Sequence, residues 1–376
     1  MEETKDSLES LRAALTACDG ALVSHMAERM RLVRKVAELK LDKGLPTFDR
    51  AREAALLAEL EEAGEAAELS REIIRDVYAV LFTASRAAQR TSLVAAVPRM
   101  SVAIIGGTQG MGAFFVRELT AAGFEVEHNG LGEGPSNVEL AGRHDLVMVA
   151  VPINATEAVI REIGPYVRTG AILVDITSVK TAPLAAMMES TQDDVSVVGT
   201  HPMFGPSTSG FDRQKVVLCK GRGDAAFSAM KRLFEAFGAE CIEASAEEHD
   251  AQMALIQVLV HEKTMVLGSV LERLKASLSR SLDFASPIYR TELAMIGRMF
   301  SQGADLYADI LTSNPEASRL SYLFEQEAAY FARAVAMGDR ETVIRRFKDV
   351  ALYMNDFAAW AKTQSDSILR DLVRHG

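Results

Sequence analysis

The hydrophobic positions along the first part of the chain follow a helical period. Apolar residues recur at steps of three and four from Leu8 to Val36, which predicts one amphipathic helix over about residues 6–42. Two shorter helices are predicted over about residues 49–63 and 69–90, after a break at Gly44-Leu45-Pro46. The first helix would be on the order of 55 Å long, more than a small domain buries alone, so we expect it to pair with a second copy.

Beyond Pro98 the pattern changes to short apolar strands that alternate with helices. This alternation predicts a parallel sheet covered by helices on both faces. Residues 91–98 show no period and are predicted to form a linker, and from Ala246 onward the period is again helical. We therefore predict an all-α domain over residues 1–92, an α/β domain over 98–245 and a helical domain over 246–376. The predicted strands are Ser101–Ile105, Glu125–His128, Leu146–Val151, Ala171–Ile176, Val195–Val198, Val216–Cys219 and Glu240–Glu243.

Composition and charge exclude several classes of protein. Hydrophobic residues make up 48% and charged residues 25%, as in globular proteins with proper cores. The formal charge of −11, from 41 basic and 52 acidic residues, argues against nucleic-acid and anionic-membrane partners. The three cysteines are odd in number and widely spaced, and the histidines show no ligand spacing, so neither a disulfide framework nor a metal site is expected. Without a long apolar run or a signal-peptide pattern, we expect a cytoplasmic protein.

Charged residues occupy positions of the first helix where a core is expected. Arg29 and Lys40 continue the apolar stripe and lie eleven residues apart, so both leave the same face. Arg12 lies seventeen residues before Arg29 and points about 100° away, which indicates a different site or a partner's site. Surface ion pairs would explain each position alone, but the set together describes a pocket for a small dianion with a hydroxyl group. The next two helices add Asp49, Arg52, Glu53, Ser85 and Gln89 at spacings of three and four.

Residues 6–90 resemble the all-α class of chorismate mutase, on these positions together with Leu11, Asp19 and Pro46. The resemblance implies an intertwined homodimer in which Arg12 reaches the partner's pocket. It also implies that Arg29 and Arg52 hold the two carboxylates of chorismate, with Ser85 near one of them. Lys40 and Gln89 would then donate hydrogen bonds to the ether oxygen, and Glu53 and Asp49 would hold the hydroxyl side of the ring. Such a rearrangement needs no nucleophile, only a compact substrate and positive charge at the developing oxyanion.

A glycine-rich turn follows the first predicted strand, with the sequence Gly106-Gly107-Thr108-Gln109-Gly110-Met111-Gly112. The order of strand, turn and helix predicts a Rossmann-like NAD(P)-binding domain, although a hairpin without ligand stays an alternative. The spacing is irregular, because Gln109 stands where the middle glycine is expected. Asn129-Gly130 stands where an acid should bind the ribose, and no arginine follows closely. NAD is therefore favoured as the cofactor, and NADP stays open.

Polar residues gather at the ends of two later strands, over residues 175–180 and 200–206. Ligands of open α/β sheets bind at the carboxyl ends of strands. His201 is held between a strand end and Pro202, and a neutral imidazole there can accept a proton from a hydroxyl while hydride leaves the same carbon. A purely structural role for this histidine stays equally open.

Residues 100–370 resemble prephenate dehydrogenase. The resemblance implies that His201 is the catalytic acceptor with Ser178 beside it, that Arg290 binds a substrate carboxylate and that His249 lines the cleft. The role of His261 stays open, because Val260 stands where the family has a basic residue. The motifs that carry the resemblance are Ser178-Val179-Lys180, His201-Pro202-Met203-Phe204-Gly205-Pro206, Glu248-His249-Asp250, Ser286-Pro287-Ile288-Tyr289-Arg290 and Leu306-Tyr307-Ala308-Asp309-Ile310.

The order of the two parts, mutase before dehydrogenase, is similar to that of the bifunctional enzymes of tyrosine biosynthesis. This resemblance implies conversion of chorismate to prephenate and then to 4-hydroxyphenylpyruvate, with L-tyrosine as an inhibitor near the dehydrogenase site. An arogenate dehydrogenase is an alternative, since arogenate carries an amino group in place of the keto group. In a further alternative, the first 90 residues form a dimerisation or regulatory module without catalysis.

Overall fold

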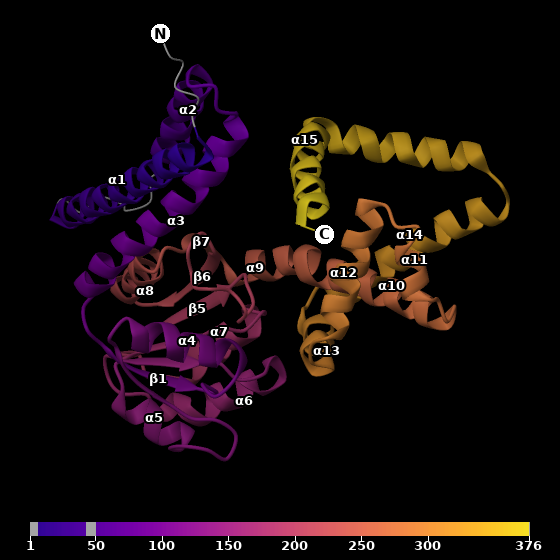
Figure 1. The fold of residues 1–376 in the computed structure, drawn as a ribbon. Helices are drawn as coiled ribbons and strands as arrows, with labels where there is room; N and C mark the ends of the chain where they lie inside the picture. Colours follow the sequence, from indigo (N-terminus) through magenta and orange to yellow (C-terminus); the bar gives the residue numbers. More distant parts are fainter. Residues whose placement is uncertain (1–6, 43–49, 376) are drawn as a thin grey trace, which may run out of the picture. The chain divides into compact units, whose positions relative to one another are not determined.

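The computed structural model describes residues 7–42 and 50–375 and divides the chain into two compact units (Figure 1). The first unit comprises Met1–Val151, Ala158–Thr177 and Pro183–Ala244. The second comprises Pro152–Glu157, Ser178–Ala182 and Ser245–Gly376. Two short segments of the middle of the chain, residues 152–157 and 178–182, therefore belong with the helical C-terminal part.

Three helices begin the first unit, as predicted: α1 (Leu8–Asp42), α2 (Arg50–Ala66) and α3 (Arg71–Ala96). Both α1 and α2 pack against α3. The predicted linker over residues 91–98 is wrong for most of its length, because α3 continues to Ala96. The reason is burial: Val94 lies in the core beside the sheet, which favours further helical turns, and the helix ends only at Val97, before Pro98.

A seven-stranded sheet follows in the order β2-β1-β3-β4-β5-β6-β7, and each predicted strand is present. One aspect of the prediction is wrong, since the sheet is not wholly parallel: β5 and β6 are antiparallel, with His201 opposite Val217. Residues 203–214 connect these strands without a helix, and a parallel pair needs a crossover. The strands are β1 (Ser101–Ile105), β2 (Glu125–His128), β3 (Leu146–Val149), β4 (Ile172–Asp175), β5 (Ser196–Pro202), β6 (Lys215–Arg222) and β7 (Glu240–Ala244).

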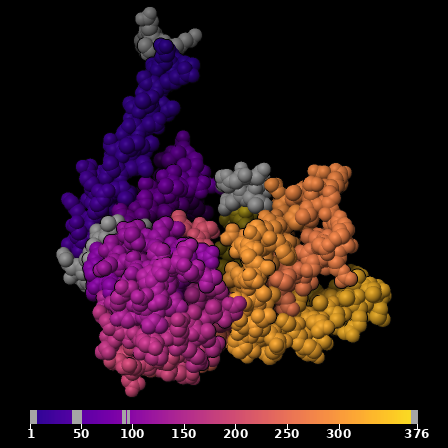
Figure 2. All heavy atoms as spheres, turned by 90° about the horizontal axis from the view of Figure 1, so that it is seen from below, coloured from indigo at the N-terminus to yellow at the C-terminus, as the bar shows by residue number. Residues whose placement is uncertain are grey.

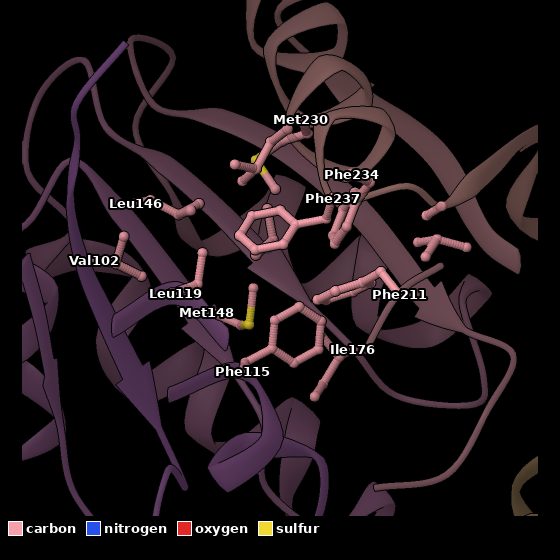
Figure 3. Packing of buried hydrophobic residues seen from close by; sticks show 14 of the residues in the cluster. Val102, Phe115, Leu119, Leu146, Met148, Ile176, Phe211, Met230, Phe234 and Phe237 are labelled. Atoms are coloured by element: carbon pink, nitrogen blue, oxygen red, sulfur yellow. The ribbon is translucent and has the colours of Figure 1, made fainter. Parts of the chain in front are cut away.

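Successive residues of each central strand enter cores on opposite faces of the sheet. On β1, Val102 and Ile104 pack with α4 (Gly110–Ala121) and α8 (Asp224–Ala236), as Figure 3 shows for Met230 and Phe234 of α8. Ala103 and Ile105 pack instead with α5 (Asn137–Arg143), α6 (Ile153–Ile163) and α7 (Thr181–Ser190). A short 3₁₀ helix, η1 (Gly164–Tyr166), follows α6. Burial on both faces explains the unbroken apolar runs of these strands and leaves their ends for polar chemistry.

The second unit is helical. Its described elements are α9 (Ala246–Met253), the π-helical η2 (Ala254–Leu259), α10 (Val260–Arg273), α11 (Leu278–Leu282), α12 (Pro287–Phe300), α13 (Ala304–Ser313), α14 (Ala317–Ala336) and α15 (Arg340–His375). A small core joins Val258 of η2 to Leu320 of α14. Contrary to our expectation, the stretch Ala246–Arg273 is long and apolar enough to cross a membrane. By itself this is weak evidence, since the core helix of a soluble protein passes the same test.

Candidate active sites

The helices α1 and α3 bring Arg29 and Ser85 together. The Arg29 guanidinium donates to the Ser85 hydroxyl and, at 3.3 Å, to the carbonyl oxygen of Leu81. It also lies 5.7 Å from the centre of the Phe82 ring. Ser85 is buried and Arg29 is half-buried, so a cation predicted to sit on the apolar stripe does face polar groups of another helix.

The other predicted mutase residues differ in exposure. Lys40 and Gln89 are half-buried, whereas Arg12 and Arg52 are exposed. Arg12 lies about 25 Å from Arg29 along the same helix, so within one chain the two side chains serve different places. Asp49 lies outside the described residues. The structure therefore assembles part of the predicted set on the surface between α1, α2 and α3.

Glu53 on α2 has a partner that sequence reasoning missed. Its two carboxylate oxygens accept hydrogen bonds of 3.0 and 2.9 Å from Nη1 of Arg86 on α3. The same guanidinium binds Asp212 through Nε. The signal in the sequence was the position of Arg86 directly after Ser85 and three residues before Gln89 on the same helix.

The glycine-rich turn after β1 has no room for side chains at three of its glycines, Gly106, Gly107 and Gly112. A Cβ on Gly112 would lie 2.0 Å from the carbonyl oxygen of Gly106. Gly106 itself has φ of +89°, and a Cβ there would lie 2.7 Å from the carbonyl oxygen of Ala150. Helix α4 then begins at Gly110 with Gln109 as its N-cap, and the Gln109 side chain makes no capping bond. Such a compact turn before a helix N-terminus fits a pyrophosphate group.

Asn129 stabilises this turn from the end of β2. Its Oδ1 accepts from the N–H of Gly106 at 3.1 Å, and its carbonyl oxygen accepts from the N–H of Gly107 at 2.8 Å. Its Nδ2 donates to Pro135 and Asn137, so the amide is fully engaged where a ribose-binding acid was expected. Neighbouring Gly130 leaves no space for an acid either, because its Cβ would lie 2.4 Å from Oγ1 of Thr108.

His201 is buried at the carboxyl end of β5. The end of the adjacent strand β4 is tied to it by Thr200, whose Oγ1 donates to the carbonyl oxygen of Asp175 at 2.6 Å. The N–H of Thr177 in turn donates to the Asp175 carboxylate at 3.0 Å. The Thr200 bond and the pairing of His201 with Val217 of β6 hold the His201 backbone at the carboxyl end of β5.

In the second unit, Asp250 joins the segment of Ser178 to α9. Its carboxylate accepts from the backbone N–H groups of Lys180 at 2.7 Å and Thr181 at 2.9 Å. It also lies 2.8 Å from Nδ1 of His249, and both side chains are buried. Burial, the largest influence, would raise the pKa of Asp250, but the hydrogen bonds from His249, Thr181 and Lys180 outweigh it and hold that pKa below its ordinary value. Asp250 thus orders two predicted site residues, Ser178 and His249.

Arg290 and His261 also belong to the second unit. Arg290 is exposed on the first turn of α12, where the Ser286 side chain caps the helix and Pro287 begins it. The His261 and Tyr307 rings lie 5.1 Å apart between centres. Burial lowers the pKa of His261 and raises that of Tyr307, which favours the neutral form of both rings. The pair therefore presents uncharged hydrogen-bonding groups.

Three family profiles match consecutive parts of the chain. Residues 11–90 match chorismate mutase type II, residues 122–243 match the nucleotide-binding domain of prephenate dehydrogenase, and residues 245–349 match its dimerization domain. Together they cover most of the sequence in the order that the residue patterns predicted.

Relatives and solved structures agree with these profiles. A prephenate dehydrogenase from A. aeolicus, solved with hydroxyphenyl propionate and NAD+, has a similar fold, with a TM-score of 0.54 at 19% identity over 70% of this chain and 99% of its own. A probable arogenate/prephenate dehydrogenase from Methanocaldococcus jannaschii is 36% identical over 73% of this chain and 68% of its own. The T-protein of Haemophilus influenzae is 32% identical, over 97% of both chains. The T-protein of Enterobacter agglomerans is 35% identical over 96% of this chain and 97% of its own length, and this chain belongs to the same family, the bifunctional chorismate mutases/prephenate dehydrogenases.

Proposed function

We propose that this bifunctional enzyme rearranges chorismate to prephenate on its α1–α3 domain. It then oxidises prephenate to 4-hydroxyphenylpyruvate on the remaining residues, with NAD as hydride acceptor. The observation that carries the proposal is the presence in one chain of both sets of groups: a half-buried Arg29 against buried Ser85, and a buried His201 at the carboxyl end of β5 in the same sheet whose first strand leads into the glycine-rich turn. Within the chain we place the domain boundaries at residues 1–92, 98–245 and 246–376.

For the mutase, the α1–α3 residues supply charge rather than covalent chemistry. Arg29 and Arg52 hold the two carboxylates of chorismate, with the Ser85 hydroxyl beside one of them. Lys40 and Gln89 donate to the ether oxygen, whose negative charge grows as its bond to carbon breaks. Glu53 and Asp49 accept from the ring hydroxyl. Holding the substrate in its compact form and stabilising that oxygen together account for the acceleration of a pericyclic step.

A homodimer is supported by the apolar surface of single elements. On α1, Leu8, Leu15 and Val23 are each about two-thirds exposed, and Figure 2 shows the indigo side chains of this helix open to solvent. In the second unit, Leu255, Val260 and Val270 of the stretch from α9 to α10 are each about half exposed. Large exposed apolar faces mark interaction sites. We propose that a second copy covers both, and that Arg12 completes the pocket of the partner.

In the dehydrogenase reaction, the residues of this chain bind the substrate and the cofactor, orient them toward each other and accept one proton. The turn of Gly106, Gly107, Gln109, Gly110, Met111 and Gly112 holds the pyrophosphate of the dinucleotide. A bound NAD would supply the acceptor for the hydride that leaves the ring carbon carrying the hydroxyl. His201 accepts the hydroxyl proton, with Ser178 beside it, while carbon dioxide leaves and the substrate ring becomes aromatic.

The remaining roles concern substrate and cofactor selection. Arg290 binds a substrate carboxylate, and His249 lines the same cleft with its ring orientation set by Asp250. We favour NAD over NADP, because the engaged amide of Asn129 and the crowded Gly130 offer no cation for a 2′-phosphate. L-tyrosine shares the phenol and carboxylate of the product, so we propose that it inhibits at the dehydrogenase site. We place the enzyme in the cytoplasm.

The test follows reduced nicotinamide by absorbance with purified protein and four combinations of chorismate or prephenate with NAD or NADP. Prompt reduction from chorismate requires both activities and identifies the preferred cofactor. Reduction from prephenate alone would remove the mutase from the α1–α3 domain and leave it as a dimerisation module. Faster turnover of arogenate than of prephenate, measured in parallel, would replace the proposed substrate.

A further inference from the structure

One arginine connects the mutase helices to the nucleotide-binding part of the same unit. Nη1 of Arg86 binds both carboxylate oxygens of Glu53 at 3.0 and 2.9 Å, and Nε lies 2.9 and 3.1 Å from the two oxygens of Asp212. Nη2 donates to Thr83 at 3.1 Å. The Arg86 side chain is only 10% exposed, so this is a shielded cation shared by two acids rather than a surface pair.

The two acids come from different parts of the protein. Glu53 and Arg86 lie within the residues that match chorismate mutase, and Asp212 lies within those that match the nucleotide-binding domain. Asp212 belongs to the segment from Met203 to Gln214 that follows His201 and Pro202 and joins β5 to β6.

The protein core holds Asp212 in place. Its neighbour Phe211 is buried, and the Phe211 ring contacts the rings of Phe114, Phe115, Phe234 and Phe237 (Figure 3). On the other side, the backbone of Gly238 comes so near that a Cβ there would lie 3.4 Å from Cα of Asp212. These contacts fix the backbone at Asp212, and Asp212 in turn holds the Arg86 guanidinium in place.

We propose that Arg86 is a positioning residue for the mutase reaction: it orients the Glu53 carboxylate toward the substrate hydroxyl and is itself held by Asp212. The inference rests on the proposed role of Glu53. Without Asp212, the guanidinium keeps Glu53 of these two acids and pairs more closely with it, which draws Glu53 from the substrate. Without Arg86, the two acids lose the cation that both bind, and their like charges repel each other more strongly. Mutase activity thus depends on a residue of the dehydrogenase part.

The experiment measures mutase kcat/KM in the full-length protein for Asp212→Asn, Arg86→Met and the double variant. We expect each single variant to lose about fivefold or more, and the double variant to lose no more than Arg86→Met alone, because the Asp212 effect passes through Arg86. The matched control is Arg75→Met, which removes another α3 arginine bound to an α2 glutamate, Glu61, with no dehydrogenase residue involved. We expect this control to keep native mutase kinetics.

An unchanged mutase rate in Asp212→Asn, or full additivity in the double variant, would overturn the proposal. So would an equal loss in Arg75→Met and Arg86→Met, which would indicate general loosening of the helices. Should Arg86→Met fail to fold, Arg86→Lys replaces it, since lysine keeps the charge but cannot bind both acids side-on; the Asp212 effect should then shrink. Failure of the mutase assignment itself is recognised separately, because Glu53→Gln would then leave the rearrangement rate unchanged.

Discussion

His249 and Asp250 are consecutive residues of α9 whose buried side chains meet, with Nδ1 of the ring 2.8 Å from Oδ1 of the carboxylate. The same carboxylate accepts from the backbone of Lys180 and Thr181, about seventy residues earlier in the chain. A single acid thereby orients a predicted substrate-binding ring and holds the segment that begins at Ser178.

Replacing Asp250 by Asn should therefore damage both stability and prephenate oxidation. The new amide would turn an N–H group toward the donors of Lys180 or Thr181, and the loss of charged hydrogen bonds should cost ~2–3 kcal/mol of unfolding free energy. Urea unfolding and prephenate kinetics measure the two effects. Asp283→Asn is the control, because Asp283 pairs with Arg280 on the surface and should contribute below about 0.5 kcal/mol. Equal stability of the two variants would contradict the role of Asp250.

The depressed pKa of Asp250 also predicts how stability changes with pH. A carboxyl group whose pKa is lower in the folded than in the unfolded protein stabilises the fold above its unfolded value, about 3.9. That contribution is lost as the pH falls through the lower, folded pKa. Between about pH 5 and 3, native protein should lose unfolding free energy more steeply than Asp250→Asn does. Parallel curves for the two proteins over this range would refute the assignment.

Arg29→Ala and Lys40→Ala should each abolish the rearrangement without changing the oligomeric state of the protein. Removal of a cation that holds a substrate carboxylate or the breaking ether bond should lower mutase kcat/KM by ~10²-fold or more. Chorismate turnover and sedimentation velocity provide the two readouts. Arg31→Ala is the control on the same helix, since Arg31 is exposed and pairs with Glu28. Mutase activity near the native level in either test variant would show that the site lies elsewhere.

His201→Asn should lower prephenate oxidation sharply without weakening NAD binding. Asparagine keeps a polar side chain of similar reach but cannot accept the hydroxyl proton, so kcat should fall by about 10²–10⁴-fold. NAD affinity is measured by titration calorimetry. His144→Asn replaces another buried histidine of the same unit, which bonds to the Leu140 carbonyl oxygen away from the sheet edge, and should retain native kcat. If both variants oxidise prephenate equally well, His201 is only structural.

Gly112→Ala should weaken cofactor binding. A Cβ at 2.0 Å from the Gly106 carbonyl oxygen cannot fit without backbone movement, and that movement would displace the turn that we propose holds the pyrophosphate. We expect the KM for NAD to rise about tenfold or more. Gly142→Ala on α5 is the control. Its Cβ would lie 3.6 Å from the Tyr166 carbonyl oxygen, an ordinary contact, and the change should raise stability slightly. A native KM for NAD in Gly112→Ala would show that this turn does not bind the cofactor.

Local pattern alone determined much of this protein. Short apolar runs located all seven strands and the helical period located the first three helices, because both patterns are properties of neighbouring residues. The glycine-rich turn was recognisable from its order of strand, turn and helix. The same local character made the sequence recognisable as a mutase followed by a dehydrogenase, before any contact between distant residues was known.

Only the tertiary structure decided the features that depend on distant partners. Contacts across the fold decide three such features. They are the antiparallel pairing of β6 with β5, the extension of α3 to Ala96, and the hydrogen bonds from the backbone of residues 180 and 181 to Asp250. Arg86 illustrates the reason: its acids lie 33 and 126 positions away, so no periodic pattern marks them. Such partners are selected when the chain packs, because buried polar groups must find hydrogen-bond partners. The spacing of residues along the sequence does not indicate which partners these will be.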